Sequence, residues 1–262
     1  AGRLRTRGTF LAHNRDLVLD WEHSTELKAP RGDEAPAAAW FRELRIRDEK
    51  LAPWPRTPEI VREHVGAYYA MVTHLDEQMG RVLETLEQSG HADNTIVIFA
   101  GDNGLAVGQH GLLGKQNLYE HSVRVPLIIA GPGVPAGDQC DALCYLHDVF
   151  PTVCEMLGME TPDTVEGASL LPVMRGGADR VRDDLYLAYM EAQRGVSDGR
   201  WKLLEYCVDG NRTTQLFDLG TDPRETDNLA DDPEWADHVE RLRDRLRTWQ
   251  TETDDPVTDK FR

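Results

Sequence analysis

Two short apolar runs enclose a glycine-rich loop, and this arrangement restricts the chain to few folds. Residues 95–100 and 125–130 are continuous runs rich in β-branched side chains. Such runs are typical of strands buried on both faces, as in a parallel sheet. The first run stops at Gly101-Asp102-Asn103-Gly104, and the second stops at Gly131-Pro132-Gly133. The pattern predicts an α/β protein whose loop lies at one end of a sheet.

A long helix is expected before the first run. Thr57-Pro58-Glu59 has the features of a helix start, with a capping hydroxyl, a proline and an acid in the first turn. Gly90 is a suitable stop. Between these points one apolar stripe recurs every three or four residues, through Val61, Val65, Tyr68, Val72, Leu75, Met79, Val82 and Leu86. So long a stripe suits a helix that lies across a sheet.

The second half of the chain predicts a smaller antiparallel subdomain. Residues 148–157 have a short helical pattern that Gly158 ends. Beyond Gly176-Gly177 the hairpin signals Asp198-Gly199 and Asp209-Gly210-Asn211 separate short strand patterns, at 185–190, 194–197, 201–206 and 215–219. Asp232 opens a last helix with one apolar face. We therefore expect an unassigned segment (1–40), the second half of an α/β core (41–177) and a C-terminal antiparallel sheet with a terminal helix (178–262).

Composition excludes several classes of protein. The net charge of −17 argues against nucleic acid as a partner. No apolar run is long enough for a membrane span. The four cysteines form no CxxC pair, so we expect buried or semi-buried thiols in preference to metal or redox chemistry. The first residues are basic but lack an apolar segment, so no signal peptide is visible. Because we expect the chain to be a fragment, its compartment stays open.

The loop after the first run carries the residues that could bind a ligand or take part in catalysis. Asp102 and Asn103 present oxygen donors where open α/β sheets place their ligands. Oxygen donors suit Ca²⁺ or Mg²⁺, and Ca²⁺ takes about 6 to 8 of them. Lys115 carries an ammonium group that can reach an oxyanion. Two donors do not complete a metal site, and Asp-Asn-Gly is also a common turn sequence. A hard cation beside an oxyanion is therefore one hypothesis, and a turn with a surface lysine is the other.

Three further residues of the loop region are weaker candidates. His110 and His121 could bind an anionic substrate, although local backbone could equally satisfy His110. Arg124 adds a second cation to the loop, but it could instead pair with Glu120 or with backbone carbonyls. The glycines of the loop allow close backbone approach, but they form neither a GxGxxG nor a Walker pattern.

These residues lie in a longer stretch that resembles the second half of the sulfatases, in the alkaline phosphatase superfamily. The resemblance spans about residues 41–250 and rests on many segments, which include AGDNGLAVGQHGLLGKQNLYEHSVRVPLIIAGPG, YYAMVTHLDEQMGRVLETLEQSG, VFPTVCEMLGM, RGVSDGRWKLL and TQLFDLGTDPRETDNLA. It implies an alkaline-phosphatase-like mixed or parallel sheet flanked by helices. It also implies that Asp102 and Asn103 ligate a metal, usually Ca²⁺, and that Lys115 holds the sulfate ester. The nucleophile of the family is a formylglycine, made in a C/S-x-P-x-R motif.

The chain departs from the family pattern in its first half. It contains no C-x-P-x-R or S-x-P-x-R motif, and the first Asp-Asp metal pair is missing. His13 is a loose candidate for the sulfate-binding histidine, but its neighbours do not match. The resemblance therefore implies a C-terminal half with part of a metal site and no nucleophile. We expect a longer protein, a partner chain or a homo-oligomer to supply the rest, and little turnover by this chain alone.

Three functions follow from this resemblance. The leading hypothesis is hydrolysis of a small-molecule or saccharide sulfate ester by the parent protein. The second is hydrolysis of phosphonate monoesters or phosphodiesters on the same scaffold. The third is a non-catalytic, anion-binding remnant. Gln193, Arg194 and Trp201 could approach the substrate from the C-terminal sheet, although core packing is the alternative for Trp201.

Overall fold

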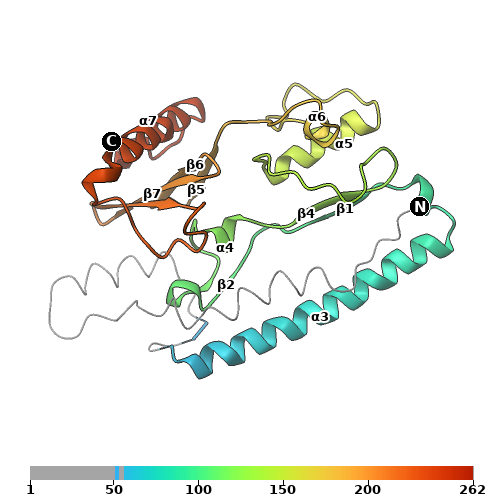
Figure 1. Ribbon diagram of the computed structural model, residues 1–262, viewed down its shortest axis with the longest axis horizontal. Coiled ribbons are helices and arrows are strands. Elements are labelled where there is room, and N and C mark those ends of the chain that lie inside the picture. Colours follow the sequence, from blue (N-terminus) through green and yellow to red (C-terminus); the bar gives the residue numbers. More distant parts are fainter. Residues whose placement is uncertain (1–50, 53–55, 262) are drawn as a thin grey trace. The chain divides into compact units, whose positions relative to one another are not determined.

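A computed structural model describes residues 51–52 and 56–261, and Figure 1 shows their helices and strands. The chain forms two compact units. Of the described residues, the first unit contains those up to Lys115 together with Val125–Ala136, and the second contains Gln116–Arg124 together with those from Gly137 onward. The expectations for residues 1–40, for His13 and for the resemblance at 41–50 lie outside the described residues. The predicted boundary at residue 177 stays a prediction.

The long helix of the first unit begins where its capping signals predict. Helix α3 spans Pro58–Gln88, and the hydroxyl of Thr57 accepts a hydrogen bond from the Ile60 N–H. Gly90 follows the helix in a left-handed conformation, with φ of 73°. Val61 is the buried residue of α3, whereas Leu75 and Val82 are exposed. Packing of this stripe across a sheet therefore stays a prediction.

The two apolar runs of the first unit form a pair of strands. Strand β1 (Val97–Ala100) pairs with β4 (Leu127–Ala130), and the Gly101 N–H extends the pairing to the Pro126 carbonyl at 3.1 Å. The pair is antiparallel, so a parallel orientation is wrong for these two strands. A continuous apolar run indicates that both faces of a strand are covered, but it carries no information about strand direction.

The second unit contains the predicted antiparallel sheet. Its strand order is β5-β6-β7-β8, with bounds at Leu185–Tyr189, Gln193–Ser197, Trp201–Val208 and Asn211–Asp218. Asp209 and Gly210, with φ of 51° and 79°, make the two-residue turn between Val208 and Asn211. Two central residues at positive φ are typical of the type I′ hairpin turn, which matches the twist of the strands.

The terminal helix packs on this sheet. A 3₁₀ turn, η4 (Pro233–Trp235), is capped by the Asp232 carboxylate, and α7 (Ala236–Glu252) follows directly. The apolar face of α7 and the inner face of the sheet share one buried cluster, made of Val196, Trp201, Leu203, Leu216, Val239, Leu242 and Leu246. The predicted sheet with its C-terminal helix is therefore confirmed.

Short helices complete the second unit. The segment before the sheet contains η3 (Leu146–Asp148), α5 (Val149–Met156) and α6 (Leu171–Met174), and η5 (Thr258–Phe261) ends the described chain. Pro151 lies in the first turn of α5, where it is tolerated, and Gly158 follows the helix with φ of 67°. All four cysteines are free thiols; Cys154 is buried and Cys144 and Cys207 are half-buried, as expected, but the expectation is wrong for Cys140, which is exposed. Among the described residues, no helix has the length and apolarity needed to cross a membrane.

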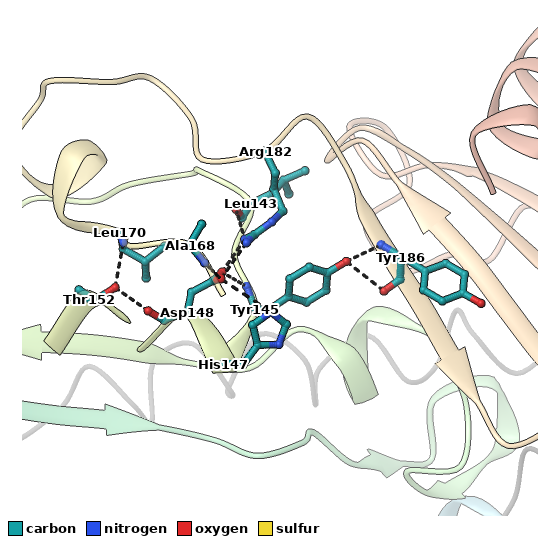
Figure 2. A network of polar contacts seen from close by, with 9 residues as sticks. All are labelled: Leu143, Tyr145, His147, Asp148, Thr152, Ala168, Leu170, Arg182 and Tyr186. Carbon is teal, nitrogen blue, oxygen red and sulfur yellow. Dashed lines mark hydrogen bonds and ion pairs between the residues drawn. The ribbon is translucent and has the colours of Figure 1, made fainter. Parts of the chain in front are cut away.

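A buried carboxylate organises this segment of the second unit (Figure 2). Asp148 is fully buried, and it accepts hydrogen bonds from the Ala168 N–H at 2.8 Å and the Tyr145 N–H at 2.6 Å. The Arg182 guanidinium donates to both carboxylate oxygens of Asp148. Its Nη2 lies 2.7 Å from Oδ1, and its Nη1 donates to Oδ2. Burial alone would raise the pKa of Asp148, but these hydrogen bonds, above all that from Arg182, hold it below its ordinary value.

The same network reaches strand β5. The Arg182 guanidinium lies over the Tyr145 ring, 4.6 Å from its centroid (Figure 2). The Tyr145 hydroxyl accepts from the Tyr186 N–H at 2.6 Å and donates to the carbonyl of the same residue at 3.2 Å. The Thr152 hydroxyl donates to the Asp148 carbonyl at 2.6 Å (Figure 2). The Asp148 cluster, meaning Tyr145, Asp148, Thr152, Arg182 and Tyr186 with their backbone partners, therefore ties the start of α5 to the first strand of the C-terminal sheet.

Candidate functional site

The Asp-Asn pair lies directly after strand β1, as the sequence predicts. Asp102 is exposed, and its Oδ1 accepts a hydrogen bond from the Asn103 N–H at 2.9 Å. The Asn103 amide nitrogen donates to the Gly104 carbonyl at 2.9 Å, which directs the amide oxygen away from the backbone. Lys115 Nζ donates to this Asn103 Oδ1 at 3.1 Å. The structure therefore brings the carboxamide and the ammonium together.

A small ladder explains why residues 12 positions apart meet. Strand β2 (Ala106–Val107) pairs antiparallel with β3 (Leu113–Gly114), so the chain returns beside its own path. Gly108 and Gly114 have φ of 120° and 102°, which side chains with a Cβ rarely adopt. The glycines of the loop thus allow the reversal that places Lys115 next to Asn103.

The two candidate histidines lie in different units. His110 is in the turn η2 (Gln109–Gly111) at the closed end of the β2–β3 ladder, and its own φ is 54°. Arg56 secures this turn by donating to the Gly111 carbonyl at 2.8 Å. His121 lies in the short helix α4 (Glu120–Val123) of the second unit, with its ring 5.7 Å from that of Tyr119. A substrate-binding role for either histidine stays a prediction.

The donor set of the loop fits part of a site for a hard cation. Asp102 offers an exposed carboxylate, and Asn103 offers an amide oxygen, which are ligands that Ca²⁺ and Mg²⁺ accept. Within residues 51–52 and 56–261, no group of three or more His, Cys, Asp and Glu residues is arranged to hold a metal. Two donors do not complete a site for such a cation, so the metal-binding role of Asp102 and Asn103 stays a prediction.

The candidates on the C-terminal sheet have other partners. Arg194 is almost fully buried and binds Asp255 through two hydrogen bonds of 2.8 Å. The hydrogen bond from Arg194 holds the pKa of Asp255 well below its ordinary value. Trp201 stacks on His238 at 4.0 Å within the core, which confirms the core-packing alternative. Gln193, also buried, donates to the Gln116 carbonyl at 2.9 Å. None of the three is exposed for substrate.

Sequence reasoning missed a buried ion cluster in the second unit. Lys202 has no exposed surface, and its Nζ lies 2.9 Å from Glu120 Oε1 and 2.8 Å from Glu225 Oε1. The possible pairing of Glu120 with Arg124 is therefore wrong for this carboxylate, since it pairs with Lys202. The available signal was a lysine between the apolar residues Trp201 and Leu203 of a strand pattern, because a buried lysine requires anionic partners.

Comparison with protein families identifies the chain along most of its length. The family model described as "Sulfatase" matches residues 20–159, and the model "N-sulphoglucosamine sulphohydrolase, C-terminal" matches residues 108–252. Each match covers more than half of the chain, and together they include the loop from Asp102 to Lys115.

Individual relatives agree with the family matches. The chain is 36% identical over 184 residues to a choline-sulfatase of Rhizobium meliloti, which covers 68% of this chain and 35% of the relative. It is 29% identical over 238 residues to an N-acetylglucosamine-6-O-sulfatase of Bacteroides thetaiotaomicron, which covers 86% of this chain and 42% of the relative. The chain thus spans well under half the length of these two relatives.

Solved structures confirm the fold. The structure of BT4656 in complex with its substrate D-glucosamine-2-N,6-O-disulfate has a TM-score of 0.72 and 28% identity, and covers 86% of this chain and 47% of that chain. A phosphonate monoester hydrolase of Agrobacterium radiobacter has a TM-score of 0.65 and 28% identity, and covers 76% of this chain and 43% of that chain. On the family matches and these likenesses, the chain belongs to the sulfatase family.

Proposed function

We propose that the full-length protein hydrolyses a sulfate ester, and that this chain supplies a metal-binding pair and a substrate-binding lysine. The observation that carries the proposal is the hydrogen bond of 3.1 Å between Lys115 Nζ and Asn103 Oδ1, directly beside the exposed Asp102 carboxylate. The ammonium is then in contact with the amide oxygen, and the residue next to that asparagine carries an exposed carboxylate, which are the groups needed to bind an anionic ester next to a cation. The choline-sulfatase and N-acetylglucosamine-6-O-sulfatase relatives support sulfate as the group transferred.

Each residue has a distinct role in this proposal. Asp102 and Asn103 hold a divalent cation, with Ca²⁺ preferred because the donors are a carboxylate and an amide oxygen. A bound cation supplies electrostatic stabilisation to the ester oxygens. Lys115 places its ammonium beside the same oxygens and offsets the charge that develops on them as the ester bond breaks. Sulfatases generally use a metal ion and a formylglycine, and we expect the formylglycine in the part of the protein outside this chain.

The substrate class is a small-molecule or saccharide sulfate ester. The relatives act on both kinds, since one is named for choline and another for N-acetylglucosamine. BT4656 binds a sulfated glucosamine. The described residues supply the groups that bind the sulfate, whereas the alcohol part of the ester would meet residues outside the loop from Asp102 to Lys115.

The test is turnover of 4-nitrophenyl sulfate by the full-length protein, measured after chelation and after addition of Ca²⁺. We expect activity that chelation removes and Ca²⁺ restores. Asp102→Ala should abolish most of this activity, and Lys115→Ala should lower kcat by about 10²- to 10³-fold, as the loss of one strong oxyanion contact does. Lys260→Ala is the matched control, because this lysine is exposed and pairs with Glu191. Full activity of Asp102→Ala would contradict the assignment of the metal pair.

The second candidate is hydrolysis of phosphonate monoesters or phosphodiesters. It is favoured by the solved phosphonate monoester hydrolases of Agrobacterium radiobacter and Silicibacter pomeroyi, with TM-scores of 0.65 and 0.68. These scores are close to that of BT4656. Rates on 4-nitrophenyl sulfate and on 4-nitrophenyl phenylphosphonate separate the two functions, and a preference for phosphonate by several decades would replace the sulfatase proposal. Absence of turnover on both substrates would leave the non-catalytic alternative.

A further inference from the structure

The segment that follows Lys115 in sequence belongs to the unit of the C-terminal sheet. Residues 116–124 cluster with Gly137–Arg262 and not with the loop that precedes them. Two of their backbone groups bind side chains of that unit. Gln193 Nε2, from β6, donates to the Gln116 carbonyl at 2.9 Å. Glu225 Oε2 accepts from the Glu120 N–H at 2.6 Å, at the start of α4. The chain is thus held one residue after Lys115 and again five residues after it.

Side chains of the segment make two more attachments. The Tyr119 hydroxyl donates to Gln215 Oε1 of β8 at 3.0 Å. Lys202 Nζ of β7 joins Glu120 to Glu225, at 2.9 and 2.8 Å. Strands β6, β7 and β8 each contribute one contact, so the segment is fixed by the sheet and not by a single flexible side chain.

The ion cluster is buried, which makes this attachment specific. Lys202 is 0% exposed and Glu225 is 3% exposed. A buried ion that loses its partner is left with an uncompensated charge, so the three side chains keep one arrangement. Glu225 also has a positive φ of 58°, which is uncommon for a residue with a Cβ.

We infer that Gln193, Lys202 and Glu225 are positioning residues for Lys115, which they hold through the backbone of residues 116–120. A lysine carries its charge on a flexible stem, so the place of its ammonium depends on where its own backbone is fixed. A misplacement of about 1 Å in a reacting group can cost about 10²-fold in rate. The inference rests on the proposed role of Lys115 in sulfate-ester hydrolysis.

The first test uses Gln193→Leu in the full-length protein. This change removes the donor to the Gln116 carbonyl while it keeps a side chain of similar size. We expect kcat for 4-nitrophenyl sulfate to fall by about 10-fold or more, on the scale set by misplacement of a reacting group, with a smaller change in KM. In a Lys115→Ala background the same substitution should have almost no effect on kcat, because a double-mutant cycle isolates coupling. An equal loss in both backgrounds would overturn the inference.

The second test asks whether the ion cluster acts in the same way. Lys202→Met should lower kcat and Lys202→Arg should restore part of it, because arginine keeps the charge between Glu120 and Glu225. If Lys202→Met does not fold, Glu225→Gln replaces it, since its amide oxygen can still accept from the Glu120 N–H. Unchanged kcat in a folded Glu225→Gln variant would remove the ion cluster from the positioning role.

The matched control is Asp255→Asn, which disrupts another buried ion pair of the same unit. Asp255 binds Arg194, and none of its hydrogen bonds reaches residues 116–124. We expect a lower Tm without a change in kcat, and additive behaviour with Lys115→Ala. Hydrogen exchange at residues 115–122 should rise in Gln193→Leu and not in Asp255→Asn. Equal exchange in the two variants would contradict the inference.

The two proposals fail in different ways. Wild-type protein that hydrolyses no sulfate ester refutes the proposed function. Active wild-type protein in which Gln193→Leu changes neither kcat nor exchange at residues 115–122 refutes the positioning role and leaves the function intact.

Discussion

The loop that carries Lys115 and the cluster around Asp148 use polar groups in opposite ways. In the loop, Asp102 is exposed and its carboxylate binds only a neighbouring backbone N–H among the contacts described. In the cluster, Asp148 has no exposed surface, and its two oxygens accept hydrogen bonds from Arg182 and from two backbone N–H groups. Polar groups that have all their partners stabilise a fold, whereas exposed ones keep capacity for a ligand. The contrast predicts that substitutions in the two regions alter different measurable properties.

The largest expected effect is on stability, in the Asp148 cluster. Asp148→Ala removes the carboxylate that pairs with the Arg182 guanidinium. It also leaves the N–H groups of Tyr145 and Ala168 without their hydrogen-bond acceptor. Breaking a buried ion pair costs about 3–5 kcal/mol, so the free energy of unfolding should fall by that amount. Urea unfolding followed by circular dichroism measures it. A loss below about 1 kcal/mol is the size expected for an exposed ion pair. Such a result would contradict the predicted difference in stability contribution between the Asp148 cluster and the loop.

The second prediction concerns the loop. Lys115→Ala should leave the free energy of unfolding within about 0.5 kcal/mol of wild type, because the side chain is exposed. Its effect should appear in kcat, with a loss of about 10²- to 10³-fold. The two quantities are measured on one preparation by urea unfolding and by 4-nitrophenyl sulfate turnover. Stability loss comparable to that of Asp148→Ala would assign Lys115 to the fold.

A third, smaller effect is the dependence of stability on pH. The pKa of Asp255 is lowered in the folded state, chiefly by the hydrogen bond from Arg194, with a further contribution from Tyr186. An unfolded aspartate has a pKa of about 3.9. The stabilisation of the fold by ionised Asp255 is therefore complete above the pKa of the unfolded state. It is lost as pH falls toward the lower pKa of the folded state, because the unfolded chain takes up the proton first.

Asp255→Asn sharpens this prediction. It should lower stability at neutral pH and flatten the decrease in stability below pH of about 4. Unfolding by urea at several acidic pH values checks the slope. A slope equal to that of wild type would show that Asp255 does not carry the acid dependence.

The smallest effect is expected on the surface. Arg180 and Asp183 form an ion pair of 2.7 Å, but their side chains are 71% and 77% exposed. Arg180→Ala should change the free energy of unfolding by less than about 0.5 kcal/mol, because solvent screens such pairs. It provides the baseline against which Asp148→Ala and Lys115→Ala are judged. A change above about 1 kcal/mol would show that exposure alone does not separate the two kinds of polar contact.

Features that depend on neighbouring residues could be predicted from the sequence. The start of α3 follows from a capping threonine and a proline, and the β7–β8 turn follows from Asp209-Gly210, because both depend on local backbone chemistry. The meeting of Asn103 and Lys115 was also accessible, since glycines allow the intervening loop to reverse. The family resemblance added the roles of these residues, which the spacing alone left open between a metal site and a turn.

Features that depend on distant residues could not be predicted. The antiparallel direction of β1 and β4 is decided by how the loop between them returns, and the apolar runs are the same for either direction. The Lys202–Glu120 ion pair joins residues 82 positions apart. A lysine within a strand pattern indicates that it needs a partner, but the sequence does not say which acid supplies it.

One residue, Glu225, meets two separable demands. Its left-handed backbone forms a turn that glycine would adopt more readily, while its carboxylate reaches the start of α4 and Lys202. Glu225→Gly would thus preserve the path of the chain and delete the attachment, whereas Glu225→Ala would delete the attachment and keep the unfavourable backbone. The difference in the free energy of unfolding between the two variants separates the effect of backbone conformation at this position from the effect of the carboxylate.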